Sequence, residues 1–196
     1  MKQTLVLETS SSAGSWALFE DKALCASDSF EGRASGKLLE SLEKVRPRLS
    51  RVGGIVVGVG PGSFSGIRVA IATAQGLAFG WNCPVIPCRS SHALAWKHAD
   101  VPVLGVFADA KRRQLFFTAY EHGRLRHKTV LIPADEVENS LGKCSLAVSP
   151  EPLPPIPLSE APVAEALGRA YFKFGPEPDL RLEPIYLHEP VGETKI

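Results

Sequence analysis

Hydrophobic positions in the first half of the chain switch between strand-like runs and helical spacing. Leucines recur at three- and four-residue intervals after residue 35, which is typical of an amphipathic helix, with Pro47 in its last turn. The all-apolar run at 54–60 is typical of a strand buried on both faces of a parallel sheet. The elements predicted up to residue 98 are three strands (4–8, 15–20, 23–30), a helix (35–49), a strand (54–60), a helix (66–79), a strand (84–87) and a helix (90–98).

The second half repeats this order of elements. The prediction is three strands (103–108, 114–121, 124–132), a helix (133–141), a strand (145–149) and a helix (159–174). Between Pro150 and Pro162, six of thirteen residues are proline, so we expect an extended linker there. The sequence therefore predicts an α/β fold of two related β-β-β-α-β-α lobes, residues 1–100 and 101–196, the second of them shortened.

Composition narrows the classes of protein that the chain can belong to. With 196 residues, 44% of them hydrophobic, the chain can bury a substantial core, which excludes disorder throughout. A net charge of +1 argues against a dedicated nucleic-acid module. No apolar run reaches the length of about 20 residues that a membrane span needs, so no membrane association is expected. The first apolar stretch is too short for a secretory signal, and we expect a cytoplasmic protein.

A glycine-rich stretch at 58–68 joins the buried strand to the following helix. It lacks the Gly-Lys-Ser/Thr of a P-loop, the spacing of a nucleophile elbow and the third glycine of a dinucleotide loop. Ser63 or Ser65 is expected to cap the helix. Two interpretations remain open, an anion site at the helix N-terminus or a tight turn that packs strand against helix.

Helix 66–79 is apolar or small around nearly its whole circumference, whereas a surface helix keeps a polar face. It is therefore either internal to its lobe or half of a protein–protein interface to which the preceding helix also contributes. The residues predicted to face a partner are Leu38, Leu39, Leu42, Arg68, Ile71, Ala74, Gln75 and Ala78.

The glycine-rich stretch reads G-x-G-P-G-S-F-S-G-x-R and is followed by A-x-G-L-A at residues 74–78, a pattern that resembles the TsaB (YeaZ) family. Shorter segments resemble the same family in the same order: Leu5 to Ser10, Ala108 to Arg113 and Pro184 to Leu187. The resemblance implies a duplicated actin-like/Hsp70-like fold. It also implies a non-catalytic partner of TsaD in threonylcarbamoyl transfer to N6 of the tRNA adenosine next to the anticodon. TsaE would join through the complex, tRNA would bind only once it is assembled, and a homodimer would use the same helices.

An actin-like nucleotide site needs glycine-rich phosphate loops, and this chain carries larger side chains at both places. Glu8 and Asp109 either oppose each other and hold Mg²⁺ or cap turns, and we favour the caps. Neither a catalytic residue nor a resident metal or cofactor is expected, although ATP or ADP with Mg²⁺ at the interface between subunits stays open. The alternative function is a stand-alone nucleotide-dependent kinase or ATPase. The residues of this degenerate cleft are Glu8, Thr9, Ser10, Gly60, Gly62, Ser63 and Asp109.

Basic residues recur between 111 and 128, with only Glu121 opposing them. A basic hairpin of this kind either contacts tRNA phosphates in the assembled complex or forms a solvated edge that discourages strand pairing, and we favour the edge. The residues concerned are Lys111, Arg112, Arg113, Arg124, Arg126 and Lys128.

Overall fold

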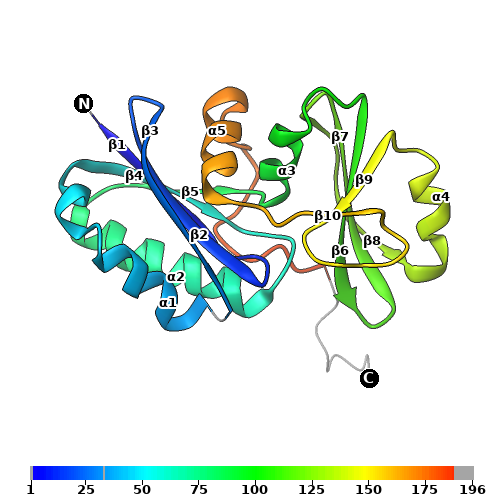
Figure 1. Ribbon diagram of the computed structural model, residues 1–196, viewed down its shortest axis with the longest axis horizontal. Helices are drawn as coiled ribbons and strands as arrows, with labels where there is room; N and C mark the ends of the chain where they lie inside the picture. The colour runs from blue at the N-terminus through cyan, green and yellow to red at the C-terminus, as the bar shows by residue number, and fades with distance from the viewer. Residues whose placement is uncertain (1, 33, 188–196) are drawn as a thin grey trace, which may run out of the picture.

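Two five-stranded mixed sheets with the same internal order form the molecule (Figure 1). The computed structural model describes residues 2–32 and 34–187. The strand orders are β3-β2-β1-β4-β5 and β8-β7-β6-β9-β10, antiparallel among the first three strands and parallel among the last three. The strands of the first sheet are β1 (Gln3–Glu8), β2 (Ala13–Glu20), β3 (Ala23–Glu31), β4 (Val52–Gly58) and β5 (Val85–Cys88). Those of the second are β6 (Val103–Lys111), β7 (Gln114–Glu121), β8 (Arg124–Pro133), β9 (Leu146–Ser149) and β10 (Leu158–Ser159). The repeated order confirms the predicted duplicated fold.

Helices α1 (Ala34–Glu43) and α2 (Phe64–Trp81) cover one face of the first sheet (Figure 1). The predicted helix at 35–49 is wrong after Glu43, where a turn and then a 3-10 helix (Arg46–Arg51) follow, with Pro47 at the start of this second element. A proline lacks the N–H that a continuing helix needs, but it is tolerated in a first turn. Within the described part of the chain, no helix is both long and apolar enough to cross a membrane.

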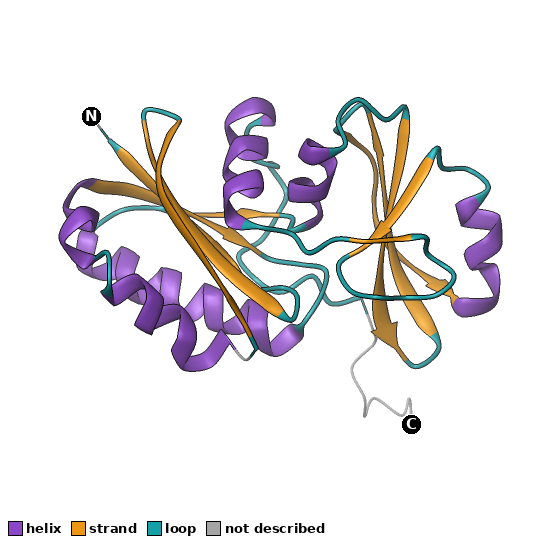
Figure 2. Ribbon diagram, viewed as in Figure 1, coloured by secondary structure: helices purple, strands orange, loops and turns teal. Residues whose placement is uncertain are grey.

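The two lobes exchange their last helices, which lie side by side between the sheets (Figure 2). Helix α3 (Ser91–Lys97) follows the first sheet, yet its Leu94 belongs to the core of the second sheet. Helix α5 (Ala164–Phe174) follows the second sheet, and its Leu167 packs with Phe19 on the first. Each sheet is thus completed by a helix from the other half, which ties the lobes together.

The proline-rich segment is not the linker that the sequence predicts. Leu158–Ser159 forms β10, Ile156 is buried in the core of the second lobe, and the last helix begins at Ala164 rather than at 159. The second sheet therefore keeps all five positions. The second lobe is shortened at two elements, the two-residue β10 and the five-residue α4 (Val137–Leu141). A 3-10 helix (Ala134–Glu136) precedes α4.

After α5 the chain returns across the molecule as an extended segment, residues 175–187, which we call the C-terminal strap. Leu180, Leu182 and Ile185 pack against the core of the first lobe. The backbone N–H of Ile185 donates to the carbonyl oxygen of Val59 at 2.9 Å. The strap is therefore an integral part of the fold.

Candidate functional site

A cavity of about 600 Å³ lies where the two lobes and the strap meet, and we call it the interlobe cavity. The first lobe contributes the β1–β2 turn and the start of α2, and the second lobe contributes the β6–β7 turn and the segment after β9. The strap forms the remaining wall. The lining residues are Ser10, Gly62, Ser63, Phe64, Ser65, Ile67, Ala108, Asp109, Ala110, Lys111, Phe116, Ser149, Pro150, Glu151, Pro152, Leu153, Pro184, Ile185 and Tyr186.

Glu8 and Asp109 occupy similar places in the two lobes, because Glu8 ends β1 and Asp109 lies two residues before the end of β6. Glu8 Oε1 accepts a hydrogen bond from the N–H of Ser10 at 2.6 Å, and Asp109 Oδ1 accepts one from the N–H of Lys111 at 2.7 Å. Both carboxylates thus cap turns two residues ahead, as we favoured. Asp109 lines the cavity whereas Glu8 lies buried and does not. No cluster of three or more metal-ligating side chains occurs within residues 2–32 and 34–187.

The Glu8 carboxyl group is completely buried beneath the β1–β2 turn. A Cβ atom at Gly58 would lie 1.9 Å from Glu8 Oε2. The Glu8 carboxyl group therefore occupies space that is open only because residue 58 is a glycine. Burial raises the pKa of Glu8, against the hydrogen bond from the backbone N–H of Ser10, which lowers it. The folded protein therefore favours the protonated, neutral form of this side chain more than the unfolded chain does.

Glu8→Gln is expected to remove one pH-dependent contribution to stability. Above the ordinary glutamate pKa of about 4.3, the unfolded chain releases this proton while the folded protein retains it. The free energy of unfolding of the wild type therefore falls as pH rises towards the raised pKa, and the variant lacks this fall. Urea unfolding of both proteins at pH 5 and pH 8 measures the difference. An equal change with pH in both would contradict the assignment.

The glycine-rich stretch packs backbone against backbone. A Cβ atom at Gly62 would lie 2.1 Å from the carbonyl oxygen of Ser10, and one at Gly66 would lie 2.1 Å from that of Thr9. The N–H of Ser63 donates to the Ser10 carbonyl oxygen at 2.6 Å, and the Thr9 hydroxyl donates to that of Gly66 at 2.8 Å. Ser63 caps α2 by accepting from the N–H of Gly66. These contacts favour the tight-turn interpretation over the anion site.

The predicted cleft residues divide into two groups. Ser10, Gly62, Ser63 and Asp109 line the interlobe cavity, whereas Glu8, Thr9 and Gly60 are buried behind it. Sequence reasoning missed the aromatic side chains Phe64 and Tyr186 and the acidic Glu151, all of which line the same cavity.

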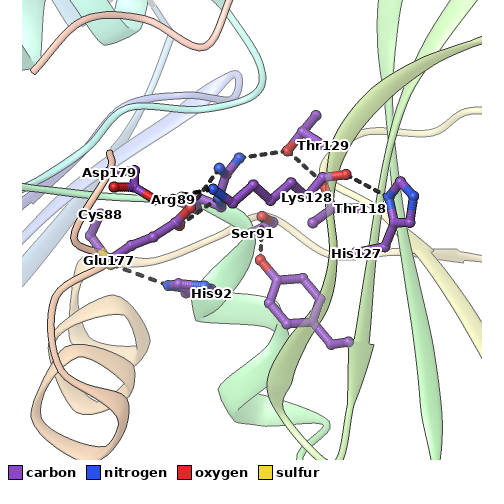
Figure 3. A network of polar contacts seen from close by, with 11 residues as sticks. Cys88, Arg89, Ser91, His92, Thr118, His127, Lys128, Thr129, Glu177 and Asp179 are labelled. Atoms are coloured by element: carbon purple, nitrogen blue, oxygen red, sulfur yellow. Dashed lines mark hydrogen bonds and ion pairs between the residues drawn. The ribbon is translucent and has the colours of Figure 1, made fainter. Parts of the chain in front are cut away.

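A buried ion pair joins the two lobes to the strap, as Figure 3 shows. Arg89 Nε and Nη2 donate to the two carboxylate oxygens of Glu177 at 2.7 and 2.8 Å, and Nη1 donates to Thr129 Oγ1 at 2.9 Å. The Thr129 hydroxyl is hydrogen-bonded to that of Thr118 at 2.8 Å. The side chains of Arg89 and Glu177 are only 7% and 12% exposed. This arrangement fixes the junction between the lobes.

Burial favours the neutral forms of His92, Cys88 and Tyr120 at the junction. Burial lowers the pKa of His92 to about 4, and burial raises the pKa of the Cys88 thiol and of the Tyr120 hydroxyl. His92 Nδ1 lies 3.5 Å from Cys88 Sγ (Figure 3). Tyr120 shares a hydrogen bond with Ser91 at 2.7 Å. A neutral imidazole beside a protonated thiol is not an activated nucleophile, so the cluster serves as packing.

The residues predicted to face a partner differ in their burial within this chain. Five belong to the core of the first lobe and are buried: Leu38, Leu42, Ile71, Ala74 and Ala78. Arg68, which lies beside Phe64, is exposed, as are Leu39 and Gln75. Both helices also expose residues that the prediction omitted. We define the outer helix face as Leu39, Ala72, Gln75, Gly76 and Phe79, in which Leu39 is 56% and Phe79 92% exposed.

The basic residues between 111 and 128 form two groups. Arg124, Arg126 and Lys128 are exposed on β8, the edge strand of the second sheet, in agreement with the favoured interpretation as a solvated edge. Gln114 pairs with Pro133 and Glu121 pairs with Arg124, so the turn at Lys111 and the charges at Arg124 lie at opposite ends of the β7–β8 pair. At about 3.3 Å per residue, the two groups are roughly 23 Å apart along the strand. Arg126 and Lys128 face Glu121 and Asp179 at 3.9 and 3.6 Å.

Comparison with known proteins gives consistent matches. The family model described as TsaD: tRNA N6-adenosine threonylcarbamoyltransferase matches residues 25–152. The tRNA threonylcarbamoyladenosine biosynthesis protein TsaB of Haemophilus influenzae is 37% identical over 82 residues, which cover 40% of this chain and 34% of that protein. TsaB of Escherichia coli is 27% identical over 126 residues, which cover 60% of this chain and 54% of that protein. The chain thus spans between about a third and about half of these curated relatives.

Solved structures match over nearly the whole length. YeaZ from Pseudomonas aeruginosa superposes with a TM-score of 0.73 at 23% identity, covering 95% of this chain and 100% of that one. A second structure, described as an uncharacterized protein with similarity to peptidase YEAZ from Pseudomonas aeruginosa, has a TM-score of 0.74 at 25% identity and covers 96% and 100%. The chain therefore has the fold of these YeaZ structures. Because the family model covers more than half of the chain, this protein belongs to the family of that model, within which its relatives place it in the TsaB/YeaZ group.

Proposed function

We propose that this chain is the non-catalytic partner subunit that supports TsaD in transferring threonylcarbamoyl to N6 of the tRNA adenosine next to the anticodon. TsaE joins through the assembled complex, and two copies of the chain pair through the outer helix face when TsaD is absent. ATP or ADP with Mg²⁺ would bind between the subunits rather than in the cavity of this chain. The names of the relatives and of the matching family model support this proposal.

The observation that carries the proposal is the contrast between the interlobe cavity and the outer helix face. At the wall of the cavity, the N–H of Ser63 already donates to the carbonyl oxygen of Ser10, so the glycine-rich stretch does not offer this group to a phosphate. On the outer helix face, by contrast, Phe79 is almost fully exposed and nothing surrounds the position of a Cβ atom at Gly76. Small residues beside an exposed aromatic ring allow another protein backbone to approach closely.

Leu39→Glu and Phe79→Glu are expected to weaken association with TsaD at least tenfold, because each places an unpaired charge in a desolvated contact. Their melting temperatures should stay close to that of the wild type, because both side chains are exposed. Calorimetric titration of TsaD with each purified variant measures the affinity. Leu187→Glu, which changes an exposed leucine of the strap, is the matched control and should bind like the wild type. Wild-type affinity in both test variants would refute the assigned interface.

A further inference from the structure

Two carboxylate groups and one ammonium group lie together in the wall of the interlobe cavity. Asp109, Lys111 and Glu151 all line the cavity, and the Lys111 ammonium group forms an ion pair with the Asp109 carboxylate. The hydrogen bond and ion pair with Asp109 raise the pKa of Lys111, and the Glu151 carboxylate adds to this rise. The protein's own lysine therefore shows that this part of the wall stabilises an ammonium group.

The Lys111 side chain is held only weakly beside these carboxylates. The side chains of Lys111 and Asp109 are 82% and 47% exposed, and an ion pair between exposed groups contributes little to stability. The ammonium group of a ligand can therefore replace that of Lys111 at a small cost. Among the described residues that line the cavity, Lys111 is the one cation and faces two carboxylates, so the wall can accept a further positive charge.

A buried hydroxyl group without a partner lines the same cavity from the first lobe. Ser10 is only 2% exposed, and its Oγ atom has no hydrogen-bond partner within residues 2–32 and 34–187. Buried polar groups in proteins are nearly always paired, and an unpaired one costs free energy. The backbone of Ser10 is fixed by hydrogen bonds to Glu8 and Ser63. A ligand that enters the cavity can supply the missing partner of the hydroxyl group.

Apolar side chains form much of the remaining wall of the cavity. They come from both lobes and from the strap, and they include Ile67, Phe116, Leu153 and Ile185. Such a wall favours contact with hydrocarbon. The cavity volume of about 600 Å³ lies within the range of roughly 300–1,000 Å³ that is typical of small-molecule sites. The wall therefore suits a small molecule that combines a positive charge with a hydrocarbon body.

We propose that the interlobe cavity binds a small primary amine with a short hydrocarbon body and a second polar group. The ammonium group takes the place of that of Lys111 beside Asp109 and Glu151, and the body lies against the apolar wall. The second polar group forms a hydrogen bond with the Ser10 hydroxyl. Because Ser10 belongs to the first lobe and both carboxylates belong to the second, such a ligand ties the two lobes together. The site is separate from the outer helix face, and it goes beyond the proposed function.

NMR titration of the isotope-labelled full chain with four compounds of the same chain length tests this proposal. Aminopentanol carries both polar groups, pentylamine only the ammonium group, pentanediol only hydroxyl groups, and hydroxypentanoate a carboxylate in place of the ammonium group. Aminopentanol is expected to bind with a Kd of about 1 mM or lower and to shift the backbone amide signals of Ser10 and Lys111. Pentylamine should bind more weakly, and the other two compounds should cause no measurable shift.

Four variants test the assigned contacts. Asp109→Asn and Glu151→Gln keep the oxygen that accepts from a backbone N–H but lose the charge, and each should raise the Kd of aminopentanol about fivefold. Lys111→Met removes the competing ammonium group and should lower this Kd about two- to fivefold. Ser10→Ala should bind aminopentanol no better than pentylamine, without a fall in melting temperature, because its hydroxyl has no partner in the free protein.

The matched control is Glu183→Gln, which removes an exposed carboxylate of the strap that does not line the cavity. This control should bind aminopentanol like the wild type. Absence of binding by the wild type, equal affinity for pentanediol, an unchanged Kd in both carboxylate variants, or weaker binding by Lys111→Met would each overturn the proposal. Because TsaD is absent from these titrations, such a failure leaves the proposed partner role intact.

Discussion

Replacing Arg89 by alanine is expected to lower the free energy of unfolding by about 3–5 kcal/mol. The guanidinium group of Arg89 is the partner of the buried Glu177 carboxylate and also donates to Thr129. Its removal leaves a carboxylate without a counter-charge at a place that water hardly reaches. The same change also releases the start of the strap from the junction between the lobes.

Chemical unfolding of Arg89→Ala beside Arg169→Ala measures this effect against a suitable control. Arg169 pairs with Glu165 on the same helix, where both side chains are more than a third exposed, so its loss should cost less than about 1 kcal/mol. Combining Arg89→Met with Glu177→Leu should recover much of the stability, because no buried charge remains. If Arg89→Ala were no more destabilising than Arg169→Ala, the buried pair would not fasten the junction.

Gly66→Ala is expected to destabilise the protein by about 3 kcal/mol, because the new methyl group meets the carbonyl oxygen of Thr9 and a backbone atom cannot turn aside. The β1–β2 turn and the start of α2 must then separate, which also lengthens the hydrogen bond from the Thr9 hydroxyl to the Gly66 carbonyl oxygen.

Gly76→Ala in the same helix is the matched control, and its expected effect has the opposite sign. Nothing lies within 4 Å of a Cβ atom at Gly76, so alanine should stabilise the protein by about 0.5–1 kcal/mol through its higher helix propensity. Thermal unfolding of the two variants distinguishes the cost of the lost close contact from the gain in helix propensity. Equal destabilisation by both changes would show that glycine serves the helix itself rather than the contact with Thr9.

The order of strands and helices could be predicted from the sequence because each element carries its own periodicity. The predicted strands at 15–20 and 114–121 agree with β2 and β7 to within two residues. The predicted ends of the elements were wrong where two local sequence signals compete. Pro47 begins a new element instead of interrupting an old one, and the proline-rich segment hides β10 because two strand residues produce no alternation.

The sequence could not predict which side chains of the helices are buried, nor which residues meet at the junction between the lobes. Helix α2 is apolar or small nearly all round, so its sequence does not distinguish the buried Ala74 from the exposed Ala72. Arg89 and Glu177 are 88 residues apart, and no periodicity connects them. The exchange of α3 and α5 likewise depends on contacts between lobes that only the folded chain brings together.

The glycine-rich stretch shows how a specific motif can be required by backbone packing. Its failure to match the phosphate-binding templates agrees with contacts in which Gly62 and Gly66 admit the backbone of the neighbouring turn. The acidic Glu151 of the cavity lies in the proline-rich segment, where residue type alone gave no sign of its position.

Transfer of threonylcarbamoyl from threonylcarbamoyl-AMP to tRNA is the measurement that tests the proposed role most directly. Formation of the modified nucleoside is followed with the chain alone, with TsaD alone, and with TsaD plus either the wild type or Phe79→Glu. We expect no product from the chain alone, a marked gain when the wild type joins TsaD, and no gain from the variant. Product formed by the isolated chain, or full support of TsaD by Phe79→Glu, would contradict the account.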